Sequence, residues 1–194
     1  EDAIFPVRAA GIPVNIKNTN QPEDRGTMIV SESAEHCDHI ITGIAGKKGM
    51  SVINIEKDKM NSEIGFGKNV LRALEKSNVS FEHMPSGVDT MSVVIATEAL
   101  AGKETAIIDE IKSRVHPDQI YIESNLALIA VVGRGMKSAR GTAAILFSAL
   151  ADARVNIKMI DQGSSELNII VGVEEEDFEV AIKAIYKRFI GINQ

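Results

Sequence analysis

The second half of this sequence resembles the first half at a constant distance of 76 residues. Val52 and Ile53 correspond to Leu128 and Ile129. Further pairs follow without a gap: Met60 and Met136, Gly65 and Gly141, Ala73 and Ala149, Leu74 and Leu150, Val79 and Val155, Gly87 and Gly163. Glycines and apolar residues that recur at one distance predict two copies of one structural unit.

Each copy has the pattern of alternating strands and helices. Apolar, β-branched runs predict strands at 50–55, 79–84 and 90–97 in the first copy, and at 126–132, 155–160 and 167–173 in the second. Helical spacing of apolar residues predicts a helix after the first strand of each copy: Phe66, Val70 and Leu74, then Ala143, Phe147 and Leu150. A second helix closes each copy, with Ile107, Ile108, Ile111 and Val115, then Phe178, Ile182, Ile185 and Phe189.

This order of elements is typical of the ferredoxin-like α+β fold, βαββαβ, in which helices pack on one face of an antiparallel sheet. The first copy has a last strand at 119–123, whereas the second copy has no residues left for one. We expect the apolar run 40–45 to complete the second copy and to join both copies into one body. The predicted domains are therefore 48–125 and 40–46 plus 126–194, preceded by a separate segment at 1–35.

Composition excludes several classes of function. A net charge of −6 argues against binding to a nucleic-acid backbone. The longest apolar stretch, 126–132, is too short to span a bilayer, and no signal peptide is visible, so no membrane partner is expected. A single cysteine, Cys37, suits a reducing compartment, and we expect a cytoplasmic protein. Because the chain begins with Glu1, we expect a fragment of a longer protein.

Three further interpretations of the sequence are weaker. The cluster Glu35, His36, Cys37, Asp38 and His39 has the composition of a metal site but is too crowded for a zinc spacing, so no metal is expected. The βαββαβ order also fits an RNA-recognition domain, but the central strands lack stacking aromatic residues. No glycine loop with a lysine that could hold phosphates is present, so we expect no catalytic residues and no cofactor in this chain.

Several stretches resemble the regulatory region of aspartate kinases. They include GIPVNIKNT at 11–19, SEIGFG at 62–67, LALIAVVGRGM at 126–136 and QGSSELNI at 162–169. The resemblance is greatest to the lysine-sensitive, single-function bacterial type, and it implies two ACT domains of ferredoxin-like fold. It also implies a kinase that phosphorylates aspartate with ATP and Mg, with its kinase domain before Glu1, residues 1–35 as its remnant and linker, and dimers formed through the ACT domains.

The loop at 59–67 precedes the first helix of the first copy. Helix starts have unpaired N–H groups and partial positive charge, which suit a carboxylate. The residues alone favour an ordinary strand-to-helix turn, but the resemblance implies that this loop holds an inhibitor. The candidate effector-binding residues are Met60, Ser62, Ile64, Gly65, Phe66 and Gly67, joined by Glu82, Asp89 and Thr90.

Glu82 is the candidate partner for a cation. It matches the position at which lysine-sensitive relatives place an aspartate against the ammonium groups of the ligand; the alternative is a solvated carboxylate on a strand. In the repeat Glu82 corresponds to Lys158, which has the opposite charge. We therefore expect a cationic amino acid to bind the first copy, and the second copy to have a structural role or to bind a neutral ligand.

The second copy repeats the loop at 133–141 and has a polar turn at 162–166. These residues are candidates for either a second effector site or an interface: Met136, Gly141, Gln162, Ser164, Ser165 and Glu166. The predicted function is feedback regulation of aspartate kinase with lysine as the expected effector; the sequence leaves threonine, or both together, open. The alternatives are an ACT amino-acid-binding protein without a kinase, and an enzyme active within these residues.

Overall fold

The chain divides into two units, residues 1–38 and residues 39–194. The computed structural model describes residues 4–30, 39–137 and 139–191. In the first unit, helix α1 (Ile4–Ala9) precedes an antiparallel hairpin of β1 (Val14–Ile16) and β2 (Thr27–Ile29). Most of the metal-like cluster, Glu35 to Asp38, lies outside the described residues.

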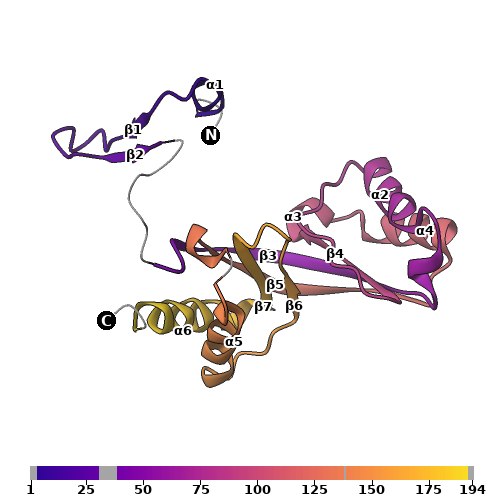
Figure 1. The fold of residues 1–194 in the computed structure, drawn as a ribbon. Helices are drawn as coiled ribbons and strands as arrows, with labels where there is room; N and C mark the ends of the chain where they lie inside the picture. Colours follow the sequence, from indigo (N-terminus) through magenta and orange to yellow (C-terminus); the bar gives the residue numbers. More distant parts are fainter. Residues whose placement is uncertain (1–3, 31–38, 138, 192–194) are drawn as a thin grey trace. The chain divides into compact units, whose positions relative to one another are not determined.

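A five-stranded antiparallel sheet forms the centre of the second unit (Figure 1). Its strands in spatial order are β4 (Thr90–Ala96), β3 (Gly43–Glu56), β5 (Gln119–Val132), β7 (Asn168–Glu174) and β6 (Met159–Asp161). The central strands β3 and β5 pair from Gly43 opposite Val132 to Glu56 opposite Gln119. Each of them is one continuous strand of 14 residues.

This continuity corrects the predicted strands. The sequence predicted separate strands at 40–45 and 50–55, and again at 119–123 and 126–132, but each pair is a single strand shared by both copies. The expectation that the run at 40–45 completes the second copy is confirmed, because the first part of β3 pairs with Leu128 to Val132 of β5. The pairing of β3 with β5 is irregular between Lys47 and Val52, where its register shifts.

Two predicted strands are much shorter than expected. The segment 79–84 contains no strand and makes only isolated bridges, from His83 to Val94 and nearby from Ser86 to Met91. Pro85, directly after this segment, has no N–H to donate to a ladder. In the second copy the predicted strand at 155–160 is reduced to the three residues of β6.

Each half of the sheet has its own pair of helices. Helices α2 (Phe66–Lys76) and α4 (Glu104–Val115) pack on the first half, and α5 (Thr142–Asp152) and α6 (Phe178–Gly191) pack on the second. Figure 1 shows the two pairs on opposite sides of the long strands. Short helices complete the unit: α3 (Thr97–Leu100), and the 3-10 turns η1 (Met60–Ser62), η2 (Arg134–Met136) and η3 (Glu175–Asp177).

The buried apolar residues form three clusters. One lies under α2 and α4 and includes Ile53, Val70 and Ile111, and the equivalent cluster under α5 and α6 includes Ile129 and Leu146. The third lies on the other faces of both halves and joins them: Met50, Val52, Val94, Leu126, Leu128 and Ile170. On the face of this third cluster, the two edges of the sheet approach each other. His83, which bridges Val94 of β4, has its Nδ1 3.0 Å from Asp161 Oδ2 in β6. The sheet is therefore curled.

The buried face of α2 is as predicted, but that of α5 differs. Phe66, Val70 and Leu74 are buried in α2. In α5 the buried residues include Leu146, whereas the predicted Phe147 is only partly buried. Because this helix is apolar on most sides, the spacing alone did not define its inner face.

Candidate functional site

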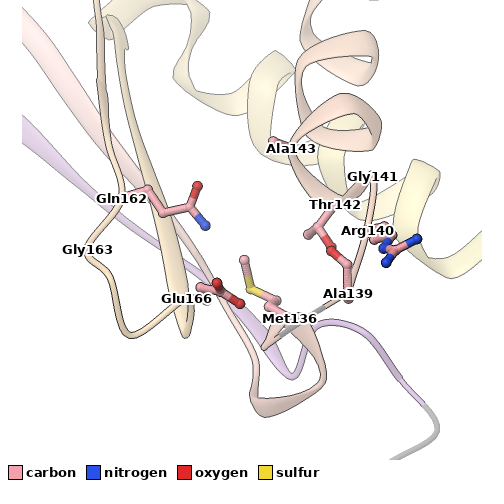
Figure 2. A pocket seen from close by; sticks show the side chains of 9 residues that line it. All are labelled: Met136, Ala139, Arg140, Gly141, Thr142, Ala143, Gln162, Gly163 and Glu166. Atoms are coloured by element: carbon pink, nitrogen blue, oxygen red, sulfur yellow. The ribbon is translucent and has the colours of Figure 1, made fainter.

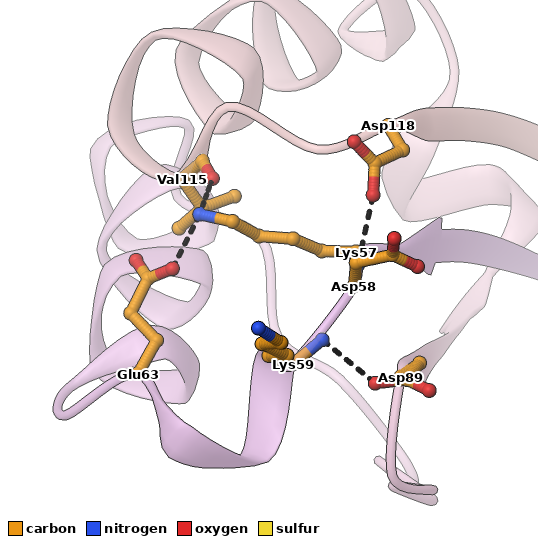
Figure 3. Close-up of polar contacts among 7 residues, drawn as sticks. All are labelled: Lys57, Asp58, Lys59, Glu63, Asp89, Val115 and Asp118. Carbon is orange, nitrogen blue, oxygen red and sulfur yellow. Dashed lines mark hydrogen bonds and ion pairs between the residues drawn. The ribbon is translucent and has the colours of Figure 1, made fainter.

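Charged side chains hold the loop between β3 and α2 in the first copy (Figure 3). Lys57 extends from the end of β3, donates a hydrogen bond to the carbonyl of Val115 at 2.5 Å and pairs with Glu63. Its ammonium also lies 5.8 Å from the centre of the Phe66 ring. One lysine therefore joins the loop, the start of α2 and the end of α4.

The same loop is bound to the turn before β4 through backbone groups. The N–H of Lys59 donates to Asp89 Oδ1 at 2.8 Å, and the N–H of Asn61 donates to the carbonyl of Val88 at 3.1 Å. Asp89, a predicted site residue, is thus a structural partner of the loop in this arrangement. These contacts fix the shape of the loop through groups of the chain itself.

Both copies begin their first helix in the same unusual way. Gly65 before α2 and Gly141 before α5 have φ angles of 85° and 87°, and among the described residues no side chain caps either helix start. A Cβ atom at either position would meet nothing within 4 Å, so the backbone conformation, not crowding, requires glycine. The unpaired N–H groups at such a start can donate hydrogen bonds to a carboxylate.

The predicted loop residues differ in what they expose. Met60 and Phe66 are buried in the core at 4% and 3% exposure, so their side chains support the loop from below. Ile64 is fully exposed, and Ser62 is exposed beside Asn61. Gly67 lies close to the side chains of Met84 and Met91. A ligand would therefore meet the backbone of 62–67 and the side chains of Ser62 and Ile64.

Glu82 lies on the segment beside β4. Its N–H donates to the carbonyl of Val94, four residues along β4 from Thr90, which lies opposite the end of β3. Four strand residues span roughly 13 Å. The Glu82 carboxylate instead pairs with Lys47, with Oε1 at 2.6 Å from Nζ. Sequence reasoning missed this partner, because the two residues are 35 positions apart.

The second copy has a pocket of about 440 Å³ between the start of α5 and the turn before β7 (Figure 2). Four predicted residues line it: Met136, Gly141, Gln162 and Glu166. Ser164 and Ser165 lie in the same turn but do not line it. The side chains of Gln162 and Glu166 point toward Met136, whereas Arg140 points away from them. Arg140, Ala139, Thr142, Ala143 and Gly163 also line the pocket and were missed, although they lie in or beside the predicted loop and turn.

A groove of about 560 Å³ lies in the first copy between α2 and the segment 79–81. It is mainly apolar at Leu71, Val79 and Phe81, with Lys68 and Arg72 at its margin. Sequence reasoning did not identify it, because the segment was read as a regular strand. Ser80 and Phe81 bring this groove next to Glu82 along the chain.

Lys158, the repeat counterpart of Glu82, is held by two carboxylates. Its ammonium pairs with Glu123 and lies 3.2 Å from Glu174. The hydrogen bonds that its ammonium donates to Glu123 and Glu174 raise the pKa of Lys158. Elsewhere in the described part of the chain, no three His, Cys, Asp or Glu side chains gather as a metal site would require. No helix among the described residues is long and apolar enough to cross a membrane.

Comparisons with known proteins identify this architecture. The sequence model of the family described as ACT domain matches residues 129–189. Aspartokinase 3 of Bacillus subtilis is 42% identical over 190 residues, which are 97% of this chain. The crystal structure of Clostridium acetobutylicum aspartate kinase matches 98% of the chain with a TM-score of 0.92 and 55% identity. The chain belongs to the aspartokinase regulatory regions. The predicted fold of two ferredoxin-like ACT copies is confirmed.

This regulatory region covers less than half of those relatives, 42% of Aspartokinase 3 and 44% of the Clostridium chain. A more distant structure, E. coli aspartokinase III in complex with lysine and aspartate, matches 97% of this chain with a TM-score of 0.78. The chain covers 41% of that protein, and at 20% identity the likeness concerns the fold alone.

Proposed function

We propose that this regulatory region is the amino-acid sensor of an aspartokinase, and that lysine binds its first copy and inhibits phosphorylation of aspartate. The observation that carries the proposal is the uncapped, glycine-flanked start of α2, which lies above a loop fixed by Lys57 and Asp89. A preformed loop of this kind offers backbone donors to the α-carboxylate of an amino acid.

The charge at Glu82 supports lysine over threonine. A carboxylate at this position attracts a second ammonium group, which lysine has and threonine lacks. In the other copy the same position carries Lys158, which would repel it. Among structural neighbours, the E. coli aspartokinase III complex contains lysine, which is a property of that protein.

The backbone of Glu82 lies beside Val94, four strand residues along β4 from Thr90, whereas the α2 start follows the end of β3 opposite Thr90. We propose that two chains pack side by side through their first copies, so that Glu82 of one chain faces the loop of the other. The exposed residues Ile64, Val88 and Phe81 are apolar surface available for such packing. ATP, Mg and aspartate belong, in this proposal, to a kinase domain outside these residues.

Inhibition requires that lysine bind the inhibited arrangement more tightly than the active one. Coupling free energies between regulatory and active sites are typically about 1–3 kcal/mol. A fixed loop on a rigid sheet is suited to this role, because a ligand at the seam shifts the relative position of two chains rather than reshaping one.

Calorimetric titration of the chain with lysine, threonine and methionine tests the proposal. We expect lysine to bind, and Glu82→Gln to weaken it about tenfold, because a charge-assisted hydrogen bond contributes about 1.5–3 kcal/mol and this one is partly exposed. The control Glu176→Gln removes the same charge in the second copy and should change nothing. Lysine binding that is absent, or equal in Glu82→Gln, would contradict the proposal.

A further inference from the structure

Glu82 and Lys158 occupy equivalent backbone positions. The N–H of Glu82 donates to Val94, and the N–H of Lys158 donates to Gly172, each at 2.8 Å. The two acceptors lie opposite equivalent repeat positions of the adjacent central strands, namely Val52 for Val94 and Leu128 for Gly172. Glu82 and Lys158 therefore carry opposite charges at the same position of their two copies.

Their partners are equivalent too. Lys47, the partner of Glu82, lies opposite Leu128, and Glu123, the partner of Lys158, lies opposite Val52. Lys47 and Glu123 are also separated by the repeat distance of 76 residues. The molecule thus contains the same ion pair twice, with its polarity reversed between the copies.

The two pairs differ in how firmly the ammonium is held. The Lys158 side chain is 26% exposed and has two carboxylates, Glu123 and Glu174. The Lys47 side chain is 57% exposed, and among the residues that the structure describes it pairs with one carboxylate, that of Glu82, itself 40% exposed. An isolated exposed ion pair contributes little, whereas several charges in a network contribute more.

We infer that Lys47 is a built-in competitor of the effector: its ammonium occupies the Glu82 carboxylate, and a cationic amino acid binds by displacing it. This inference rests on the proposed function and adds a residue that sets its sensitivity. The side chain of Lys47 ends in the same chemical group as free lysine, so the exchange replaces one ammonium with another. The second copy takes no part, because its reversed pair presents a bound cation in place of an acid.

Calorimetry of Lys47→Met tests the inference. Methionine keeps the apolar stem and removes the charge, so lysine should bind two- to fivefold more tightly, the range for an exposed pair contributing up to about 1 kcal/mol. The matched control is Lys48→Met, which removes an equal charge one residue along, where Lys48 lies 5.1 Å from the Phe178 ring. A second control, Glu123→Gln, breaks the reversed pair. Neither control should change lysine affinity.

A double-mutant cycle with Glu82→Gln distinguishes competition for the Glu82 carboxylate from a general effect of removing a positive charge. In the Glu82→Gln background, Lys47→Met should have no effect on lysine binding, because there is no longer a carboxylate to release. A gain that persists there, a gain of equal size in Lys48→Met, or no gain in Lys47→Met would overturn the inference. Failure of the unaltered chain to bind lysine would instead overturn the proposed function. Thermal unfolding confirms that each variant is folded.

Discussion

The two copies hold their equivalent loops, between the long strand and the first helix, by different contacts. In both, the segment leading into a long strand donates to the end of the other long strand at 2.8 Å: Asp118 to Glu56 in the first copy and Thr42 to Val132 in the second. The first copy adds charged contacts from Lys57 and from Asp118, whose Oδ2 accepts the N–H of Asp58 at 2.8 Å.

The second copy uses glycine at the corresponding places. A Cβ atom on Gly133 would lie 2.5 Å from the carbonyl oxygen of Ile40, and one on Gly135 would lie 2.4 Å from that of His39. Backbone therefore packs directly on backbone where the first copy has hydrogen bonds and an ion pair made by charged side chains. The comparison shows that the fold constrains the path of the loop, while the chemistry at its surface can differ between copies.

Substitutions in the buried core should have the largest effect on this shared architecture. Ile53→Ala and the equivalent Ile129→Ala each remove a fully buried side chain and should cost about 2–5 kcal/mol of unfolding free energy. Because β3 and β5 run through both halves, residues 39–194 should unfold in a single transition that either variant shifts. Two transitions in calorimetry, each sensitive to only one variant, would show that the copies are independent.

Substitution of the glycines at the helix starts should affect stability in both copies but lysine binding in only one. Gly65→Ala and Gly141→Ala place a Cβ in the left-handed region, which costs roughly 1–2 kcal/mol in either copy. Chemical denaturation should give similar losses for both. Lysine binding should weaken only in Gly65→Ala, and an equal loss in Gly141→Ala would assign the effector to the second copy.

The reversed ion pair should make a smaller and pH-dependent contribution. Lys158→Met should cost up to about 1 kcal/mol, because the site is partly exposed. The pKa of Lys158 is raised above its ordinary value of 10.5 by Glu123 and Glu174, so the stabilisation is complete below about pH 10 and is lost as the pH rises through the raised value. Denaturation curves should therefore differ between variant and parent at pH 8 and converge at strongly alkaline pH. A difference that grows with pH would contradict this origin.

The repeat predicted most of the fold but not the continuity of its central strands. Gly49 and Asn125 are equivalent residues with φ angles of 73° and 62°. The sequence predicted separate strands on either side of them, because the apolar runs at 50–55 and 126–132 have the length of ordinary strands. Here Gly49 and Asn125 form local irregularities within β3 and β5, and pairing continues beyond them. Only the tertiary partner strand distinguishes a bulge from a turn.

The site was predictable where it depends on local sequence. The glycine-flanked helix starts of both copies and the polar turn at 162–166 follow from residue types alone. The partner of Glu82 does not, because ion pairing depends on which side chains the folded sheet brings together. The repeat that relates Glu82 to Lys158 also relates Lys47 to Glu123, but it does not show which of these side chains meet.

Exchanging the polarity of the first pair tests the central claim most directly. The double variant Lys47→Glu with Glu82→Lys keeps an ion pair in place but gives the first copy the polarity of the second. If the carboxylate at position 82 selects a cationic effector, calorimetry will show at least a tenfold loss of lysine affinity with thermal stability little changed. Lysine affinity equal to that of the parent chain would contradict the account.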